Sequence, residues 1–233
     1  NFIGTYRVAN QAAKSNVKSF VLISTDKAVR PTNIMGGSKR MAEMAIQVIN
    51  QKNPNINLSM VRFGNVINSS GSVIPLFLEQ ISKGGPVTIT HKDVERYFMT
   101  IPEASNLVIQ AGEMSVGGEV FILDMGKQMK VLDIAKRLIH LSGRSVSESS
   151  NGEGIEILEV GLRDGEKMYE ELLISGNEIE TKNKRIFMSN EEFVNQKTFD
   201  DILDSCYSAI ELNDIDVIVN IMRRYVDGFT YEN

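Results

Sequence analysis

Residues 17–50, VKSFVLISTDKAVRPTNIMGGSKRMAEMAIQVIN, decide the fold of this chain. Residues 17–24 form a short apolar run bounded by polar residues, which is typical of a strand buried on both faces of a parallel sheet. A polar loop containing Pro31 and Asn33 follows. Residues 38–50 then carry apolar side chains at helical spacing. Strand, loop and helix in this order form the first part of a β-α-β unit.

The flanking sequence extends this pattern. Residues 5–14 predict a helix, and residues 58–63 (LSMVRF) predict a second buried strand, so the first 65 or so residues indicate half of a doubly wound parallel sheet. Downstream, we expect strands at 87–90, 119–123 and 155–160. We expect helices at 75–82, 102–110, 131–141 and 166–173, and a helical segment over the last 35 or so residues.

Composition excludes several classes of protein. The 233 residues include 25 basic and 30 acidic side chains, for a net charge of −5, which is unfavourable for binding nucleic acid. One Cys and two His exclude a disulfide framework and most metal sites. No apolar run approaches the roughly 20 residues that span a bilayer. We therefore expect a cytoplasmic protein that binds no metal and no nucleic acid.

The richest chemistry lies where the first strand ends. Ser24, Thr25, Asp26 and Lys27 follow one another there, and ligands of open α/β sheets bind at the carboxyl ends of strands. Met35 and Lys39 are four residues apart, which places both on one helical face. Taken singly, each is ordinary: a Met at a helix start most often fills a core, and an Asp-Lys pair in a loop is most often solvated. Their joint spacing favours a site.

The pattern S-T-D-K…M-x-x-x-K resembles the extended short-chain dehydrogenase/reductase superfamily, which uses Tyr-x-x-x-Lys with NAD or NADP; Met35 replaces the Tyr. Further matches are RFGNV (62–66), SSGSVIPLF (69–77), GGPVTITH (84–91), RYFMTIPEA (96–104) and RDGEKMYEELL (163–173). Together they resemble the bacterial polysaccharide-biosynthesis UDP-N-acetylglucosamine 4,6-dehydratases. The Asp164 of RDGEK departs from the Pro expected there.

The resemblance implies a fold and a division of the chain. The fold is the C-terminal half of a Rossmann-like doubly wound parallel sheet plus a smaller α/β substrate-binding domain. Residues 1–66 belong to the NAD(P)-binding half. Residues 67–190 bind the nucleotide sugar, with a strand and helix near 119–141 returning to the Rossmann sheet. Residues 191–233 form a C-terminal helical tail.

The resemblance also implies three sets of site residues. The catalytic set is Thr25, Asp26, Lys27, Met35 and Lys39. The cofactor set is Ser24, Met35, Lys39, Phe63, Gly64, Asn65 and Val66. The substrate set is Asn65, Pro75, Leu76, Phe77, Thr88, Ile89, Thr90, Arg96, Arg163 and Glu166. Arg96 and Arg163 would clamp the diphosphate, since a guanidinium is a planar fork of donors.

The implied reaction oxidises C4 of the sugar, eliminates water across C5 and C6, and returns the hydride to C6. Asp26 fits the acid for the leaving 6-hydroxyl, Lys27 the base for the C5 proton, and Thr25 a partner of the 4-hydroxyl. Lys39 would hold the nicotinamide ribose. Met35 has no proton to give, so our hypothesis is that Asp26, directly or through Thr25 or a water, takes the 4-hydroxyl proton.

One expected motif is absent. No G-x-x-G-x-x-G or G-x-G-x-x-G occurs in the 233 residues, although folds of this kind hold the cofactor pyrophosphate at such a turn. We therefore expect part of a longer, homo-oligomeric enzyme, with or without an N-terminal membrane region, and weak NAD(P) binding without turnover by this chain alone. Two alternatives remain open: another nucleotide-sugar epimerase or reductase, and a non-catalytic nucleotide-sugar-binding module.

Overall fold

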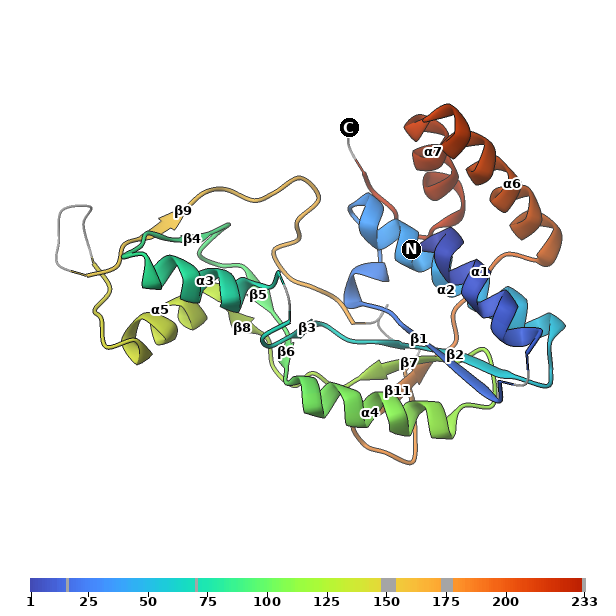
Figure 1. Cartoon of the computed structure of the whole chain (residues 1–233), viewed down its shortest axis with the longest axis horizontal. Helices are drawn as coiled ribbons and strands as arrows, with labels where there is room; N and C mark the ends of the chain where they lie inside the picture. The colour runs from blue at the N-terminus through green and yellow to red at the C-terminus, as the bar shows by residue number, and fades with distance from the viewer. Residues whose placement is uncertain (16, 70, 148–153, 173–177, 232–233) are drawn as a thin grey trace. The chain divides into compact units, whose positions relative to one another are not determined.

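The computed structural model describes residues 1–15, 17–69, 71–147, 154–172 and 178–231 (Figure 1). The chain forms two compact units. Unit 1 comprises Asn1–Phe63, Ser105–Asp124 and Glu171–Asn233, and unit 2 comprises Gly64–Ala104 and Met125–Glu170. The chain therefore crosses between the units several times, and each unit is assembled from segments that are distant in sequence.

Unit 1 is built on a five-stranded sheet with the order β1-β2-β7-β11-β10. The strands β1 (Ser19–Ile23), β2 (Asn57–Arg62) and β7 (Val120–Leu123) are parallel. The strands β11 (Ile186–Ser189) and β10 (Glu178–Glu180) continue the sheet antiparallel. The helices α1 (Phe2–Ala13) and α2 (Ile34–Lys52) lie on one face of this sheet, and α4 (Ile101–Met114) lies on the other (Figure 1). The predicted α/β class with parallel strands is confirmed.

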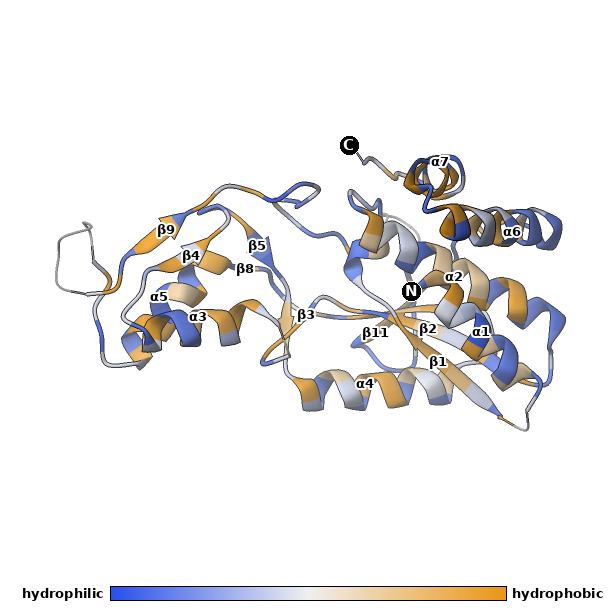
Figure 2. Cartoon of the chain, turned by 45° about the horizontal axis from the view of Figure 1, so that its top comes forward, coloured by the Kyte–Doolittle hydropathy of each residue, from blue (hydrophilic) through white to orange (hydrophobic). Residues whose placement is uncertain are grey.

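Helix α2 is the centre of unit 1, because it is covered on two sides. Toward the sheet, Ile46 and Ile49 pack with Leu58 and Met60 of β2. On its other side, α2 packs against the C-terminal helices α6 (Gln196–Leu212) and α7 (Ile215–Tyr225). Strand β1 is orange along most of its length in Figure 2, but it is the first strand in the sheet order and none of its residues is buried, Ile23 being 44% exposed. The prediction of a strand buried on both faces is therefore wrong for β1, because it has a sheet neighbour on one side only among the described residues.

The C-terminal helices belong to the core of unit 1. Phe199 of α6 is 1% exposed and meets Phe2 of α1 edge to face, with ring centroids 5.8 Å apart. Tyr6 contacts the same ring at 5.7 Å. Cys206 is buried beside them, and burial raises the pKa of its thiol to about 11. This thiol therefore stays protonated and acts as a small apolar side chain.

The described residues of unit 2 form two helices and three short ladders. The helices are α3 (Val73–Ser82) and α5 (Val131–Leu141). The ladders pair β3 (Asn65–Val66) with β6 (Phe98–Met99), β4 (Val87–Ile89) with β9 (Ile157–Glu159), and β5 (Glu95–Arg96) with β8 (Met129–Lys130). Phe77, Ile139 and Ile155 lie in its core. With so little regular structure, unit 2 depends on side-chain contacts to hold its loops.

Three predictions from the sequence were wrong in detail. The helix expected at 38–50 begins at Ile34, since Asn33 caps it. The helix at 131–141 lies in unit 2 and not on the sheet of unit 1, whereas most of α4 and the strands β10 and β11, which were expected in the sugar domain at 67–190, belong to unit 1. Residues 166–172 are not helical; residue 173 and residues 148–153 of the predicted loop at 144–154 lie outside the described residues.

Long-range hydrogen bonds explain the missing helix. The carbonyl of Met168 accepts from Glu95 N, at 3.0 Å, and from Arg96 Nη1, at 3.2 Å. The carbonyl of Glu170 accepts from Gln128 Nε2 at 2.9 Å. These carbonyls bind distant groups instead of amides four residues ahead, so tertiary contacts override the helical pattern.

No helix among the described residues is long and apolar enough to cross a membrane.

The buried position of Phe199 generates a stability prediction. Phe199→Ala removes a side chain that is 1% exposed, so we expect the free energy of unfolding in urea to fall by about 3–5 kcal/mol. Leu212→Ala, on the same helix but at a residue 77% exposed, is the matched control and should change it by less than about 0.5 kcal/mol. Equal effects of the two variants would show that α6 does not pack on α1 and α2.

Candidate active site

The loop after β1 brings an acid and an amine together. The 3-10 helix η1 (Asp26–Ala28) begins here, with Thr25 as its N-cap. Ser24 N donates to Val61 O at 2.8 Å and Asp26 N to Phe63 O at 3.2 Å, which fixes the loop against the end of β2. Asp26 Oδ1 then accepts from Thr25 Oγ1 at 2.8 Å and from Lys27 Nζ at 2.9 Å.

The second carboxylate oxygen of Asp26 has a different environment. Asp26 is 1% exposed, and its Oδ2 is buried without a hydrogen-bond partner among the described residues. A buried carboxylate oxygen in this state is costly, and such groups often mark functional positions. The side chain of Lys27 extends from the same loop and is 26% exposed to solvent. Asp26 and Lys27 thus form an ion pair in this loop, and their role in proton transfer stays a prediction.

The first turn of α2 lies directly beside this loop. Asn33 Oδ1 caps the helix by accepting from Gly36 N at 2.9 Å. A Cβ at Gly36 would lie 2.2 Å from the carbonyl oxygen of Lys27, so only glycine permits this approach. Met35 is 44% exposed, and Lys39 Nζ donates to Ile23 O at 3.1 Å. Lys39 therefore lies at the carboxyl end of β1, on the helix that also carries Met35.

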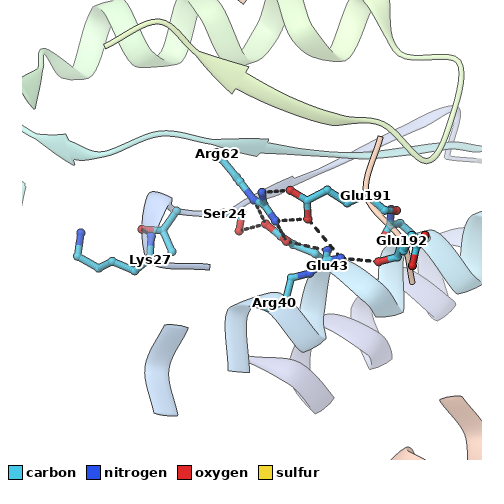
Figure 3. Close-up of polar contacts among 9 residues, drawn as sticks. Ser24, Lys27, Arg40, Glu43, Arg62, Glu191 and Glu192 are labelled. Carbon is cyan, nitrogen blue, oxygen red and sulfur yellow. Dashed lines mark hydrogen bonds and ion pairs between the residues drawn. The ribbon is translucent and has the colours of Figure 1, made fainter. Parts of the chain in front are cut away.

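A buried ionic network lies behind the loop (Figure 3). Glu43 of α2 accepts from Ser24 Oγ at 2.6 Å and from Arg62 Nε at 2.7 Å, and Arg62 Nη2 binds its other oxygen. Arg40 Nη1 also reaches Glu43, at 3.1 Å. Glu191, just after β11, pairs with both arginines. The network joins β1, α2, β2 and the segment after β11, and in Figure 3 Lys27 points away from it.

Charge pairing keeps this network ionised despite complete burial. Burial by itself would raise the pKa of Glu43, but the positive charges of Arg62 and Arg40 and the hydrogen bond from Ser24 hold that pKa below its ordinary value. Burial likewise would lower the pKa of Arg62, and Glu43 and Glu191 raise it instead. Both groups are therefore charged at neutral pH.

Sequence reasoning assigned no role to Glu43, Arg40 or Glu191. Two signals were available. Glu43 is four residues from Lys39, on the same helical face, and Arg62 is a charged residue inside the apolar strand LSMVRF. A charge in a buried strand requires a partner of opposite sign, although the sequence does not say which one.

Unit 2 contains a cavity of about 190 Å³ that gathers most of the predicted substrate residues. Pro75 is the exception and does not line it. The predicted residues that line the cavity are Asn65, Leu76, Phe77, Thr88, Ile89, Thr90, Arg96, Arg163 and Glu166. These residues come from segments separated by more than a hundred positions in sequence, so the fold of unit 2 has brought the separate motifs to one place.

Glu166 connects the polar residues of this cavity. It accepts from Arg96 Nη2 at 2.9 Å, from Thr90 Oγ1 at 3.0 Å and from Arg163 N at 3.2 Å. Arg96 is 6% exposed and also donates to two backbone carbonyls, so its guanidinium is largely used within the protein. Arg163 is exposed, which leaves its guanidinium accessible to an anion.

The predicted cofactor residues have varied surroundings. Ser24 is 5% exposed, and its hydroxyl donates a hydrogen bond to Glu43. The carbonyl of Phe63 accepts a hydrogen bond from Asp26 N. Gly64 begins unit 2, and Asn65 and Val66 form β3, where Asn65 N donates to Tyr97 O at 3.1 Å. Their role as cofactor ligands stays a prediction. The described residues contain no group of three or more His, Cys, Asp or Glu side chains suited to a metal ion.

The chain is similar to known proteins over most of its length. The family described as "Polysaccharide biosynthesis protein" matches residues 1–191. The chain is 57% identical over 179 residues to the capsular polysaccharide biosynthesis protein CapD of Staphylococcus aureus, covering 77% of this chain and 29% of CapD. It is 38% identical over 177 residues to a UDP-glucose 4-epimerase of Rickettsia canadensis, covering 75% of this chain and 49% of the epimerase.

A solved structure shows the same fold. The X-ray structure of Pen from Bacillus thuringiensis matches with a TM-score of 0.72 at 34% identity, covering 83% of this chain and 58% of Pen. The chain thus spans under a third of CapD and about half of the epimerase. These matches therefore do not establish the activity of the whole protein.

Gly36 generates a prediction about the loop. Gly36→Ala forces its new methyl group against the Lys27 carbonyl, and we expect the free energy of unfolding to fall by about 1–3 kcal/mol. Gly4→Ala is the matched control, because a Cβ there meets nothing within 4 Å and α1 should gain up to about 1 kcal/mol. Urea denaturation of both variants measures the contrast, and a stabilised Gly36→Ala would contradict the close approach.

The buried network generates a second prediction. Glu43→Gln leaves Arg62 with only part of its compensating charge, so the free energy of unfolding at pH 7 should fall by about 3–5 kcal/mol. Glu79→Gln, which breaks an exposed ion pair with Lys83, is the control and should leave the urea midpoint unchanged.

The same variant has a defined pH dependence. Since the folded pKa of Glu43 lies below its ordinary 4.5, its contribution is complete above that pH and is lost as the pH falls through the folded value. The difference in unfolding free energy between wild type and Glu43→Gln should be constant above about pH 5 and shrink below 4.5. A difference that grows on acidification would refute the assignment.

Proposed function

This chain belongs to the polysaccharide biosynthesis protein family, and on that premise we propose that it supplies the catalytic loop and nucleotide-sugar pocket of a UDP-N-acetylglucosamine 4,6-dehydratase. The product would be UDP-4-keto-6-deoxy-N-acetylhexosamine, a precursor of surface polysaccharide or glycoprotein sugars. One observation carries the proposal: the buried Asp26 carboxylate, 2.9 Å from Lys27 Nζ, retains an unpartnered oxygen at the carboxyl end of β1.

This pair supports dehydration more than epimerisation. An epimerase needs one group to carry the 4-hydroxyl proton, whereas a dehydratase needs in addition an acid at the 6-hydroxyl and a base at C5. Asp26 and Lys27 are two such groups at one loop. Met35 occupies the position of the usual tyrosine and has no proton to exchange, so the proton chemistry falls to Asp26 and Lys27.

In the first step, Asp26 accepts the proton of the 4-hydroxyl as C4 is oxidised to a ketone. Thr25 donates to Asp26 Oδ1 at 2.8 Å, which keeps the carboxylate oriented. We assign the sugar to Oδ2, which has no partner among the described residues; because this oxygen is buried, the loop has to open for the sugar to reach it. The new 4-keto group acidifies the C5 proton, which is why oxidation precedes elimination.

The reaction cycle starts with Lys27 as the free amine, after the ammonium that pairs with Asp26 has lost its proton to solvent, and in the second step this amine removes the C5 proton. The protonated Asp26 gives its proton to the 6-hydroxyl, which leaves as water, and a C5–C6 double bond forms. When C6 is reduced, Lys27 returns its proton to C5. Both side chains end the cycle in the protonation states in which they began it, and the net change is the loss of one water.

A nicotinamide cofactor, NAD or NADP, supplies the reversible hydride acceptor at C4 and donor at C6. The residues at the start of α2 fit such a group. Met35 offers an apolar, partly exposed surface, and Lys39 offers an ammonium at the end of β1 for ribose hydroxyls. Phe63, Gly64, Asn65 and Val66 complete the proposed cofactor set, while the hydroxyl of Ser24 serves Glu43.

The cavity of unit 2 supports the choice of a nucleotide sugar. Leu76 and Phe77 give it apolar walls, and Thr88 and Thr90 give it polar positions. The exposed Arg163 is the better candidate for the diphosphate, because Arg96 is already held by Glu166. The homo-oligomeric state of the intact protein is proposed from the family resemblance alone.

The test is proton NMR of UDP-N-acetylglucosamine incubated in D₂O with the intact protein that contains this chain. We expect a 4-keto-6-deoxy product. Asp26→Asn should abolish both C4 oxidation and product, because the amide cannot take the hydroxyl proton, with kcat reduced at least about 100-fold. Thr88→Ala, in the cavity of unit 2, is the comparison and should raise KM more than it lowers kcat.

Other products would identify the alternatives. A C4-epimerised sugar would contradict the dehydratase proposal and favour an epimerase, which is what the Rickettsia relative is named. Binding of UDP-N-acetylglucosamine without any conversion would support a binding module. If Asp26→Asn retained C4 oxidation, the proton relay through Asp26 would be wrong even if the wild-type product were correct.

A further inference from the structure

The last described part of the chain lies against the catalytic loop. We define the C-terminal strap as residues 222–231, the end of α7 and the segment after it. Its apolar side chains Met222, Val226 and Phe229 are 2%, 4% and 8% exposed and belong to the core of unit 1. The strap lies beyond residues 1–191, which the family comparison covers. Nothing in the family match therefore accounts for it.

The strap contacts the first turn of α2. A Cβ at Gly37 would lie 2.8 Å from Met222 Sδ and 3.0 Å from Phe229 Cε2. Met222 and Phe229 are therefore seated directly on the helix backbone at Gly37. This position lies between Met35 and Lys39, the two helical residues assigned to the site. Any shift of the strap would move the turn that carries them.

The strap also contacts the loop between η1 and α2. Thr230 N donates to the carbonyl of the buried Pro31 at 3.0 Å. A Cβ at Gly228 would lie 2.7 Å from Arg30 Cγ and 3.2 Å from Arg30 Cα, so the two backbones are in close contact. Arg30 has a φ of +40°, a left-handed conformation that a non-glycine residue keeps only when its surroundings hold it.

The strap is itself held closed. Arg223 Nη2 donates to Tyr231 O at 2.8 Å, and the rings of Phe229 and Tyr231 stack with centroids 6.2 Å apart. Phe229 N donates to Val226 O at 3.2 Å. The strap is thus a turn that is held by contacts among its own residues as well as by its contacts with the loop.

We propose that the C-terminal strap is a positioning element for the catalytic loop: Gly228 and Thr230 hold the Arg30–Pro31 turn, and Met222 and Phe229 hold the first turn of α2. The strap touches neither Asp26 nor Lys27 in any of these contacts, so it acts by fixing the loop between Lys27 and Met35. The consequence for turnover rests on the proposed function, whereas the consequence for loop order does not.

The test begins with hydrogen–deuterium exchange of the 233-residue chain. Gly228→Ala drives a methyl group into Arg30, and the amides of residues 28–38 should exchange at least about tenfold faster than in wild type. Gly143→Ala is the matched control, because Gly143 also has a positive φ, +76°, but a Cβ there meets nothing within 4 Å. Equal exchange of residues 28–38 in the two variants would overturn the proposal.

A second variant separates a displaced strap from general unfolding. Arg30→Gly removes two of the three atoms nearest to the new methyl group and suits the positive φ at that position. Combined with Gly228→Ala, it should return the exchange of residues 28–38 toward the level of Arg30→Gly alone. If the double variant exchanges as fast as Gly228→Ala, the collision with Arg30 is not the cause and the proposal fails.

The catalytic arm uses the intact protein and two readouts. Gly228→Ala should lower kcat at least about tenfold and leave the affinity for UDP, measured by titration calorimetry, within twofold of wild type. An unchanged kcat with faster exchange would overturn the role of the strap in turnover. Wild-type protein that fails to convert UDP-N-acetylglucosamine would refute the proposed function instead, and the exchange measurement would still decide whether the strap holds the loop.

Discussion

The buried ion pair between Glu43 and Arg62 is the contact on which the carboxyl end of β1 and the start of α2 depend. Glu43 is completely buried and Arg62 nearly so, and each would be unstable there without the other. Ser24 adds the end of β1 to the pair, and Glu191 adds the segment after β11. Four segments that are far apart in sequence must therefore meet in one arrangement before any of these charges is compensated. An apolar contact would tolerate sliding of α2 along the sheet, whereas this network does not.

This constraint separates the structural polar groups from those that remain for chemistry. Ser24, Arg40, Glu43, Arg62 and Glu191 satisfy one another, and Lys27 points away from them (Figure 3). Asp26 is only partly satisfied by its neighbours. Thr25 and Lys27 bind one of its carboxylate oxygens, and the other is buried without a partner among the described residues. Gly36 and Gly37 then allow the loop on one side and the C-terminal strap on the other to approach α2 closely. The loop of the proposed site is thus held by its neighbours, and Asp26 Oδ2 has no partner among the described residues.

Sequence periodicity was sufficient to predict β1, β2 and the helix between them. It was insufficient to predict the side-chain pairs that connect these elements. The apolar runs around Leu22 and Met60 predicted β1 and β2, and the spacing of Met35 and Lys39 predicted their common helical face. The helix expected at 166–173 was wrong because the Met168 carbonyl binds Arg96, a contact over 72 positions. The pairing of Glu43 with Arg62 and of Arg62 with Glu191 spans 19 and 129 positions, and no local pattern reports such partners. The short strands β10 and β11 were not predicted for the same reason: pairing with β7 and with each other, rather than a local sequence pattern, makes them strands.

The central claim is that Asp26 and Lys27 face C4, C5 and C6 of a bound hexose. A crystal structure of the intact protein with its cofactor and UDP-N-acetylglucosamine tests this most directly. Our account predicts Asp26 Oδ2 within about 3 Å of a sugar hydroxyl at C4 or C6, and Lys27 Nζ within about 3.5 Å of C5. A sugar bound with C5 beyond the reach of Lys27, and with Asp26 Oδ2 turned to protein instead of to the hexose, would contradict it.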